Sequence, residues 1–262
     1  MTTPLVLYSV QSPAIVLTLN RPDKRNALNR DLIHAIRDAF ARANDDAAGR
    51  CVILTGGGPA FCAGMDLAEL AQTLDLPNES EVVQQDAQRL SDVYEFIYTL
   101  PKPTIAAVNG PAVAGGAGLV TVCDLALADT AAKFGYPEAR RGLVAAMVMP
   151  HLLRHVGERA ARDLLLRGEL IDAQEAKRIG LINEVTLPVQ VMATAMEWAK
   201  GLAESGPQAL ANTKALLRLF DPTPTGKNFA WGSANARLTV ECKEGLRAFF
   251  DKRPPPWMPA SK

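Results

Sequence analysis

Short apolar runs alternate with helix-like segments through the first two thirds of the chain, and the pattern is mostly helical after about residue 145. Runs at 5–8 and 14–19 are separated by Gln11, Ser12 and Pro13, which predicts a hairpin-like pair of strands. Further strands are predicted at 52–54, 104–108 and 125–128. Strands that alternate with helices, followed by helices alone, indicate an α/β core with a helical C-terminal region.

Helices are predicted between these strands. Apolar residues recur at helical spacing from Arg30 to Ala43 and predict an amphipathic helix. A pair of helices is predicted over 67–100, with an interruption near 76–78, and Pro101 and Pro103 end it. With 262 residues and 48% hydrophobic content, the chain is long and apolar enough to bury a full core.

The charge balance argues against several classes of partner. Lysine plus arginine and aspartate plus glutamate are equal at 28 each, so no overall field attracts nucleic acid or an anionic membrane. No apolar run approaches the ~18 residues that a membrane span needs. We therefore expect neither nucleic acid nor a membrane as a partner, and an anionic ligand must be bound by local groups.

The cysteines and histidines show no metal pattern. The 4 cysteines are far apart and form no CxxC pair, and the 3 histidines have no HExxH spacing, so we expect no metal site. No secretory segment precedes them, and we expect reduced thiols in a cytoplasmic protein.

The stretch VNGPAVAGGAGLVTVCD, residues 108–124, carries four glycines in an apolar run. Two interpretations stay open at this point. The glycines can provide a tight turn and close helix packing, or a helix can begin at Gly115 and Gly116 with its free N–H groups facing an anion or a polarised oxygen. A GxGxxG motif, a Walker lysine and a GxSxG elbow are all absent, so the common nucleotide and serine hydrolase motifs do not apply.

Four motifs together resemble the crotonase superfamily of enoyl-CoA hydratases and isomerases. They are RPDKRNALN, FCAGMDL, VNGPAVAGGAGLVTVCDLALAD and AKFGYPEARRGL, in that order, and the resemblance extends over essentially the whole chain. It implies a spiral of repeated β-β-α units with a helical C-terminal region that helps to form trimers, often paired into hexamers. On this basis we predict a core with the acyl-CoA site over residues 1–195 and an oligomerisation region over 196–262.

The resemblance also implies a site. The substrate is an acyl-CoA thioester, whose carbonyl lies in an oxyanion hole made by the main-chain N–H groups of Met65 and Gly115. Coenzyme A is part of the substrate, and no separate cofactor is expected. Residues expected to contact coenzyme A or the acyl group are Lys24, Arg25, Ala27, Ala63, Gly64, Asp66, Leu67, Gly116 and Pro137. The apolar run 145–149 is expected to line the acyl pocket.

Proton transfer is where the chain departs from the family pattern. Enoyl-CoA hydratases commonly use two glutamates, and the first of these positions is Gly118 here, whereas the second matches Glu138. We expect Glu138 to act as the acid-base residue with a raised pKa. For Arg140 and Arg141 we expect structural salt bridges.

One carboxylate and an oxyanion hole are compatible with two reactions. We expect hydration of a 2-enoyl-CoA, with a branched or glutaconyl-type acyl chain, because a hydratase branch that also has glycine at the first glutamate position is similar in GGAGLVTVCD and PEARRGLVAAMVMP. A 3-enoyl to 2-enoyl isomerase stays open, since one base can remove and return the proton. A catalytically silent acyl-CoA-binding protein stays open as well.

Overall fold

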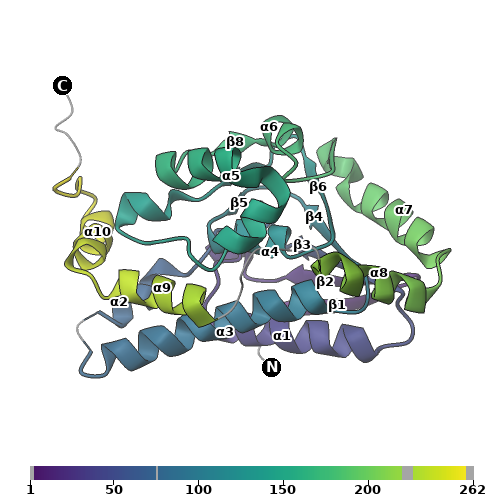
Figure 1. The fold of residues 1–262 in the computed structure, drawn as a ribbon, viewed down its shortest axis with the longest axis horizontal. Helices are drawn as coiled ribbons and strands as arrows, with labels where there is room; N and C mark the ends of the chain where they lie inside the picture. The colour runs from purple at the N-terminus through teal and green to yellow at the C-terminus, as the bar shows by residue number, and fades with distance from the viewer. Residues whose placement is uncertain (1–2, 75, 220–226, 258–262) are drawn as a thin grey trace.

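A six-stranded sheet forms the centre of the molecule in the computed structural model, which describes residues 3–74, 76–219 and 227–257 (Figure 1). Its strand order is β1-β2-β3-β4-β6-β9, with β1 antiparallel to β2 and the other neighbours parallel. The bounds are β1 Val6–Gln11, β2 Ala14–Leu19, β3 Cys51–Gly56, β4 Thr104–Val108, β6 Leu125–Asp129 and β9 Glu184–Thr186.

Alternate residues of the central strands enter two separate cores. Ile15 and Leu17 of β2 belong to the larger core, whereas Ala14 and Val16 belong to a smaller one on the other face. This follows from the two-residue period of a strand. Because both faces are covered, β3 and β4 are buried at every position, as is typical of parallel sheets.

Helices cover the two faces unequally. The larger core receives apolar residues of α1, α3, α4 and α5, whereas α7 covers the other face with Val191, Ala195 and Ala199. Figure 1 shows α1 and α3 lying side by side along one edge of the molecule and α10 at one end. The bounds are α1 Arg30–Asp45, α2 Leu67–Gln72, α3 Glu79–Thr99, α4 Gly115–Thr121, α5 Met149–Arg167, α6 Ala173–Arg178, α7 Val191–Ala203, α8 Pro207–Leu219, α9 Lys227–Arg237 and α10 Val240–Phe250.

A second, three-stranded sheet positions the glycine-rich helix. It has the order β5-β7-β8, formed by β5 Ala112–Val113, β7 Lys133–Gly135 and β8 Ile171–Asp172. The strand β5 leads directly into α4, and β7 leads into the short 3-10 helix η2, Pro137–Arg141. Because β5 pairs with β7, the starts of α4 and η2 lie next to each other.

The sequence predicted most of this architecture. The hairpin, the strands at 52–54, 104–108 and 125–128, the helix from Arg30 and the interrupted pair over 67–100 are confirmed with small shifts at the ends. The short strands β5, β7, β8 and β9 were not predicted, and two of them lie in the part expected to be mostly helical.

Two further expectations concern the division of the chain into two parts and membrane-spanning segments. The predicted division at residue 195 falls inside α7, and residues 220–226 and 258–262 of the predicted oligomerisation region lie outside the described residues. The two-part division therefore stays a prediction. Among the described residues, no helix is both long and apolar enough to cross a membrane.

Candidate active site

The loop 21–28 is fixed to the loop after β3 by one buried side chain. The Asn26 amide donates to the carbonyl oxygens of Gly57, Ala60 and Phe61 at 3.0, 2.9 and 3.1 Å, and its Oδ1 accepts from the main-chain N–H of Arg21 at 2.8 Å. Asn26 has φ of 55°, a left-handed conformation that asparagine tolerates better than most residues. The RPDKRNALN motif thus supports the loop that carries Met65.

The turn at Gly64 brings Met65 next to the start of α4. Gly64 has φ of +89°, and a Cβ there would lie 2.8 Å from the Cβ of Ala114 and 3.3 Å from the main-chain nitrogen of Gly115. Only glycine allows both this conformation and this close approach. The two segments are also joined where Val113 N–H donates to the Cys62 carbonyl at 3.0 Å.

The main-chain N–H groups of Met65 and Gly115 make no hydrogen bond within the part of the chain that the structure describes. Leu28 pairs with the residues on either side of Met65, accepting from Asp66 N–H at 2.9 Å and donating to the Gly64 carbonyl at 2.7 Å, so Met65's own N–H is left over. Gly115 is the first residue of α4, where an N–H has no partner inside the helix.

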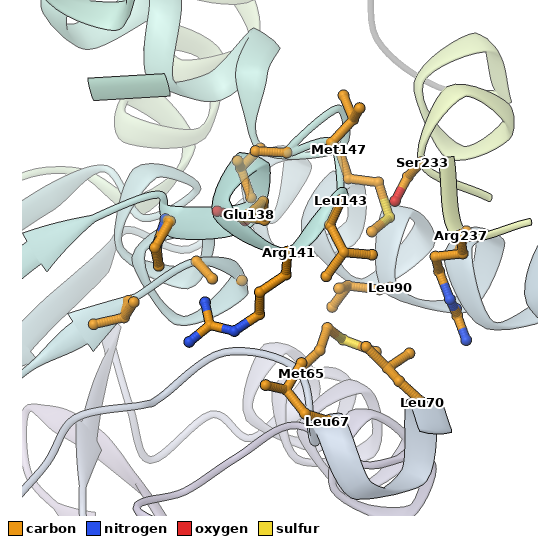
Figure 2. A pocket seen from close by; sticks show the side chains of 18 of the residues that line it. Met65, Leu67, Leu70, Leu90, Glu138, Arg141, Leu143, Met147, Ser233 and Arg237 are labelled. Carbon is orange, nitrogen blue, oxygen red and sulfur yellow. The ribbon is translucent and has the colours of Figure 1, made fainter. Parts of the chain in front are cut away.

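A cavity of about 140 Å³ lies beside these two donors. Figure 2 shows Met65, Leu67 and Leu70 on one side of it, Glu138, Arg141, Leu143 and Met147 on another, and Ser233 and Arg237 at one end. Of the residues predicted for the site, those that line the cavity are Ala63, Met65, Leu67, Gly115, Pro137 and Glu138. Three residues of the run 145–149, Ala145, Met147 and Val148, also line it, and their contact with an acyl group stays a prediction.

Glu138 is the carboxylic acid in the lining of this cavity. Its Oε2 is buried and has no hydrogen-bond partner among the described residues. Desolvation raises the pKa of Glu138 to about 7, and only partial compensation comes from a main-chain hydrogen bond and from the charge of Arg141. A carboxyl group with this pKa can both accept and donate a proton near neutral pH.

The expectation of salt bridges for Arg140 and Arg141 was wrong, since neither forms an ion pair with another described residue. Arg140 donates instead to the carbonyl oxygen of Arg167 at 3.2 Å. The guanidinium carbon of Arg141 lies 4.9 Å from the centre of the Phe249 ring. Its Nε is buried without a hydrogen-bond partner among the described residues. Its guanidinium therefore borders the cavity with hydrogen-bonding capacity to spare.

The other predicted contact residues lie outside the cavity lining. Lys24 and Arg25 are exposed on the loop 21–28, with Ala27 half-buried beside them. Asp66 caps α2 and forms a 3.1 Å ion pair with Arg21. Gly116 packs on the main chain, because a Cβ there would lie 2.2 Å from the carbonyl oxygen of Cys62.

Several residues at the site were not predicted from the sequence. Tyr94 of α3 reaches the start of α4, where its hydroxyl donates to the Gly115 carbonyl at 2.7 Å. Arg237 of α9 lines the far end of the cavity and lies 3.7 Å from Asp86. Apolar periodicity alone marks Tyr94 as a core residue, so the sequence carried no signal of this contact.

Two kinds of chemistry find no support among the described residues. Burial raises the pKa of the Cys62 thiol to about 12, so the thiolate that a nucleophile needs is disfavoured. No group of three or more His, Cys, Asp or Glu side chains within the described ranges is placed to hold a metal ion.

Comparison with known proteins identifies the family. The model of the enoyl-CoA hydratase/isomerase family matches residues 10–260, so the chain belongs to this family, as its motifs predicted. A putative enoyl-CoA hydratase of Thermus thermophilus is 43% identical over 92% of this chain and 95% of its own length. The crotonyl-CoA hydratase of Syntrophomonas wolfei is 34% identical, over 95% of each chain.

A solved structure confirms the fold at high similarity. A putative enoyl-CoA hydratase from Mycobacterium avium paratuberculosis superposes with a TM-score of 0.86 at 34% identity, covering 97% of this chain and 100% of that one. The predicted crotonase-type α/β fold is therefore confirmed.

Proposed function

We propose that the protein adds water to the double bond of a 2-enoyl-CoA thioester. One observation carries the proposal: the buried, unpartnered carboxylate oxygen of Glu138 borders the same cavity as the free N–H groups of Met65 and Gly115. The reaction needs a proton acceptor next to the acyl chain and donors for the thioester oxygen, and this cavity offers both.

Each part then has a chemical task. Water adds at C3, and the electrons of the double bond move onto the thioester oxygen to form an enolate. Two preorganised N–H donors stabilise that charge, and the loss of one such donor typically costs about 3 to 4 kcal/mol in the barrier. Glu138, ionised at the start, takes a proton from the attacking water and transfers it to C2. No cofactor beyond the coenzyme A of the substrate is needed.

A double-bond isomerase is the second candidate. It is favoured by the absence of a carboxylate at Gly118, because one base can move a proton from C2 to C4 without water. Relatives named as hydratases, among them the crotonyl-CoA hydratase of Syntrophomonas wolfei, support hydration instead. A silent acyl-CoA-binding protein would retain the same donors without turnover.

For the acyl group we propose a branched or glutaconyl-type chain. The cavity wall is apolar over Leu70, Leu90 and Leu143, which suits a branched hydrocarbon. Arg141 is one of the polar residues in the same lining, and its buried Nε lacks a partner among the described residues. A buried N–H without a hydrogen-bond partner is costly, and the carboxylate of a glutaconyl-type chain would accept from this Nε.

The coenzyme A portion would lie along the loop 21–28. Lys24 and Arg25 are exposed cations on that loop and suit the phosphate groups, with Ala27, Ala63, Asp66 and Leu67 beside them.

We further propose a cytoplasmic protein that assembles into a trimer or a hexamer. The assembly is supported by large exposed apolar side chains such as Leu216, Trp231 and Val240. Light scattering after size-exclusion chromatography measures the assembly.

Three substrates separate the candidate functions. Purified protein is incubated with crotonyl-CoA, 3-methylglutaconyl-CoA and 3-hexenoyl-CoA, and products are identified by mass spectrometry and NMR. We expect a 3-hydroxyacyl-CoA from the first two substrates. A shifted double bond without hydration would establish the isomerase, and binding without turnover would establish the silent protein.

A matched pair of variants tests the proposed preference for a glutaconyl-type acyl chain. Arg141→Leu removes the guanidinium at the cavity, whereas Arg140→Leu removes its exposed neighbour. We expect Arg141→Leu to raise KM for 3-methylglutaconyl-CoA by about tenfold to a hundredfold, from the loss of a charged hydrogen bond, and to change KM for crotonyl-CoA little. Equal effects of the two variants would refute the role of Arg141.

A further inference from the structure

The position that lacks a glutamate is filled by another polar group. A Cβ at Gly118 would lie 2.6 Å from the hydroxyl oxygen of Tyr94 and 2.5 Å from Cγ1 of Val148. A Cβ at Gly115, one turn earlier on α4, would lie 3.1 Å from the same hydroxyl. The phenol of Tyr94 therefore occupies the space into which a side chain at residue 118 would extend.

Tyr94 is held firmly in this place. Its hydroxyl donates to the Gly115 carbonyl at 2.7 Å. Its ring is buried in the larger core and meets the ring of His151 edge-on, with centroids 6.1 Å apart. Tyr94 also lines the cavity that Glu138 borders. A group fixed by packing and by a hydrogen bond is preorganised for a role in the site.

The hydroxyl keeps unused hydrogen-bonding capacity. A phenol has one donor, which is engaged with Gly115, and oxygen lone pairs that can accept. Burial raises the pKa of Tyr94 well above its usual value, so the phenol stays neutral, and the nearby Glu138 carboxylate acts in the same direction. Tyr94 can thus accept a hydrogen bond from water but cannot serve as a strong base.

We propose that the Tyr94 hydroxyl holds the water that adds to the double bond, in place of the missing second carboxylate. The inference rests on the proposed hydratase function. A water that donates one O–H to Tyr94 and the other to Glu138 has both protons engaged. Its free lone pair then remains for C3 of the substrate.

One carboxylate is enough for both proton transfers of the reaction. As the C3–O bond forms, the ionised Glu138 takes the proton of the water, and the π electrons move to the thioester oxygen. The protonated Glu138 then transfers that proton to C2 as the enolate collapses. Water is added, Glu138 returns to its ionised form, and Tyr94 neither gains nor loses a proton.

Tyr94→Phe separates this role from proton transfer at C2. Two rates are measured: hydration of crotonyl-CoA, and exchange of the C2 protons of butanoyl-CoA with D2O, which needs Glu138 and the oxyanion donors but no reacting water. We expect hydration to fall by about tenfold to a hundredfold, because the water loses its position, and exchange to stay within about threefold of wild type. Tyr98→Phe removes a hydroxyl one turn further along α3, outside the cavity lining, and should leave both rates unchanged.

The other outcomes overturn the inference. Equal loss of both rates would mean that Tyr94 acts only through the Gly115 peptide, and an unchanged hydration rate would remove any role in holding water. A wild-type protein without hydration activity would refute the proposed function and the water role with it, whereas an active wild type with an equally active Tyr94→Phe refutes the water role alone.

A crystal structure of the wild type with butanoyl-CoA decides the question without a variant, should Tyr94→Phe fold poorly. We expect an ordered water within about 3 Å of both the Tyr94 hydroxyl and the Glu138 carboxylate. A site without that water would contradict the inference.

Discussion

The loop 21–28, which supports the segment of Met65, and the segment 136–141, which carries Glu138, use their polar groups in different ways. In the loop, the Asn26 side chain bonds three carbonyls and one N–H, and Arg21 bonds the Ala27 carbonyl and Asp66. In the segment, the Tyr136 hydroxyl, Glu138 Oε2 and Arg141 Nε are buried without a hydrogen-bond partner among the described residues.

This difference distinguishes polar groups that hold the main chain in place from polar groups that are available for a reaction. Buried polar atoms nearly always have partners in folded proteins, and unpaired ones call for an explanation. The five such atoms within the described ranges include three from this one six-residue segment. We infer that the loop uses its polar groups to fix the main chain around Met65, whereas Glu138 and Arg141 of the segment line the cavity and are available to substrate and water.

The largest effect is expected from Glu138→Gln. The amide keeps the size of the side chain but cannot accept and return a proton, so turnover of crotonyl-CoA should fall by about 10²- to 10⁴-fold. Binding of a saturated acyl-CoA, measured by calorimetry, should change little. Turnover within tenfold of wild type would show that the unpaired carboxylate is not the reacting group.

The next largest effect concerns the main-chain donors. Gly115→Pro removes one N–H at the first position of α4, and we expect a loss of about 10²- to 10³-fold in kcat. Met65→Ala keeps the N–H and should cost less than about tenfold. Circular dichroism checks that both variants fold. Comparable losses from the two changes would contradict the oxyanion hole.

Asn26→Ala tests the hydrogen bonds that fix the loop 21–28. The carbonyls of Gly57, Ala60 and Phe61 lose their common donor, and alanine also adopts the left-handed conformation poorly. We expect the free energy of unfolding to fall by about 3 kcal/mol or more in urea titrations. Lys24→Ala, an exposed change on the same loop, should stay within about 0.5 kcal/mol. A mild Asn26→Ala would mean that the loop is held in another way.

A smaller effect is expected from Gly118→Ala. The new methyl group would press on the Tyr94 hydroxyl and on Val148, which should cost about 1 to 3 kcal/mol of stability. Gly201→Ala in α7 meets no atom within 4 Å and should instead stabilise by about 0.5 to 1 kcal/mol. Thermal unfolding of the two variants in parallel measures both, and shifts of equal sign would argue against the contact with Tyr94.

Long periodic segments could be predicted from the sequence because their burial is one-sided or complete. The helix from Arg30 buries Leu32, Ile33, Ile36, Phe40 and Ala43, the residues that its spacing selected. Strands of two or three residues, such as β5 and β8, are too short to show a period, and their pairing is set by the chain around them.

The candidate site was predicted in part, and the residues that were missed are brought there only by the packing of distant elements. The motifs led to Met65, Gly115 and Glu138, which line one cavity. The position of Tyr94 opposite Gly118 depends on how α3 packs against α4, and no local pattern encodes that contact. That Arg141 forms no ion pair with another described residue was missed because a sequence shows possible partners and not their distances.

The pH dependence of kcat/KM for crotonyl-CoA tests the central claim, that an ionised Glu138 is the reacting base. Burial raises the pKa of Glu138 to about 7, so the carboxyl group is protonated and inactive below that pH. We predict that kcat/KM rises by about tenfold per pH unit below pH 7 and becomes flat above it, since the rate follows the ionised fraction. A rate that falls as the pH rises through 7, or that stays constant between pH 5 and pH 8, would contradict the claim.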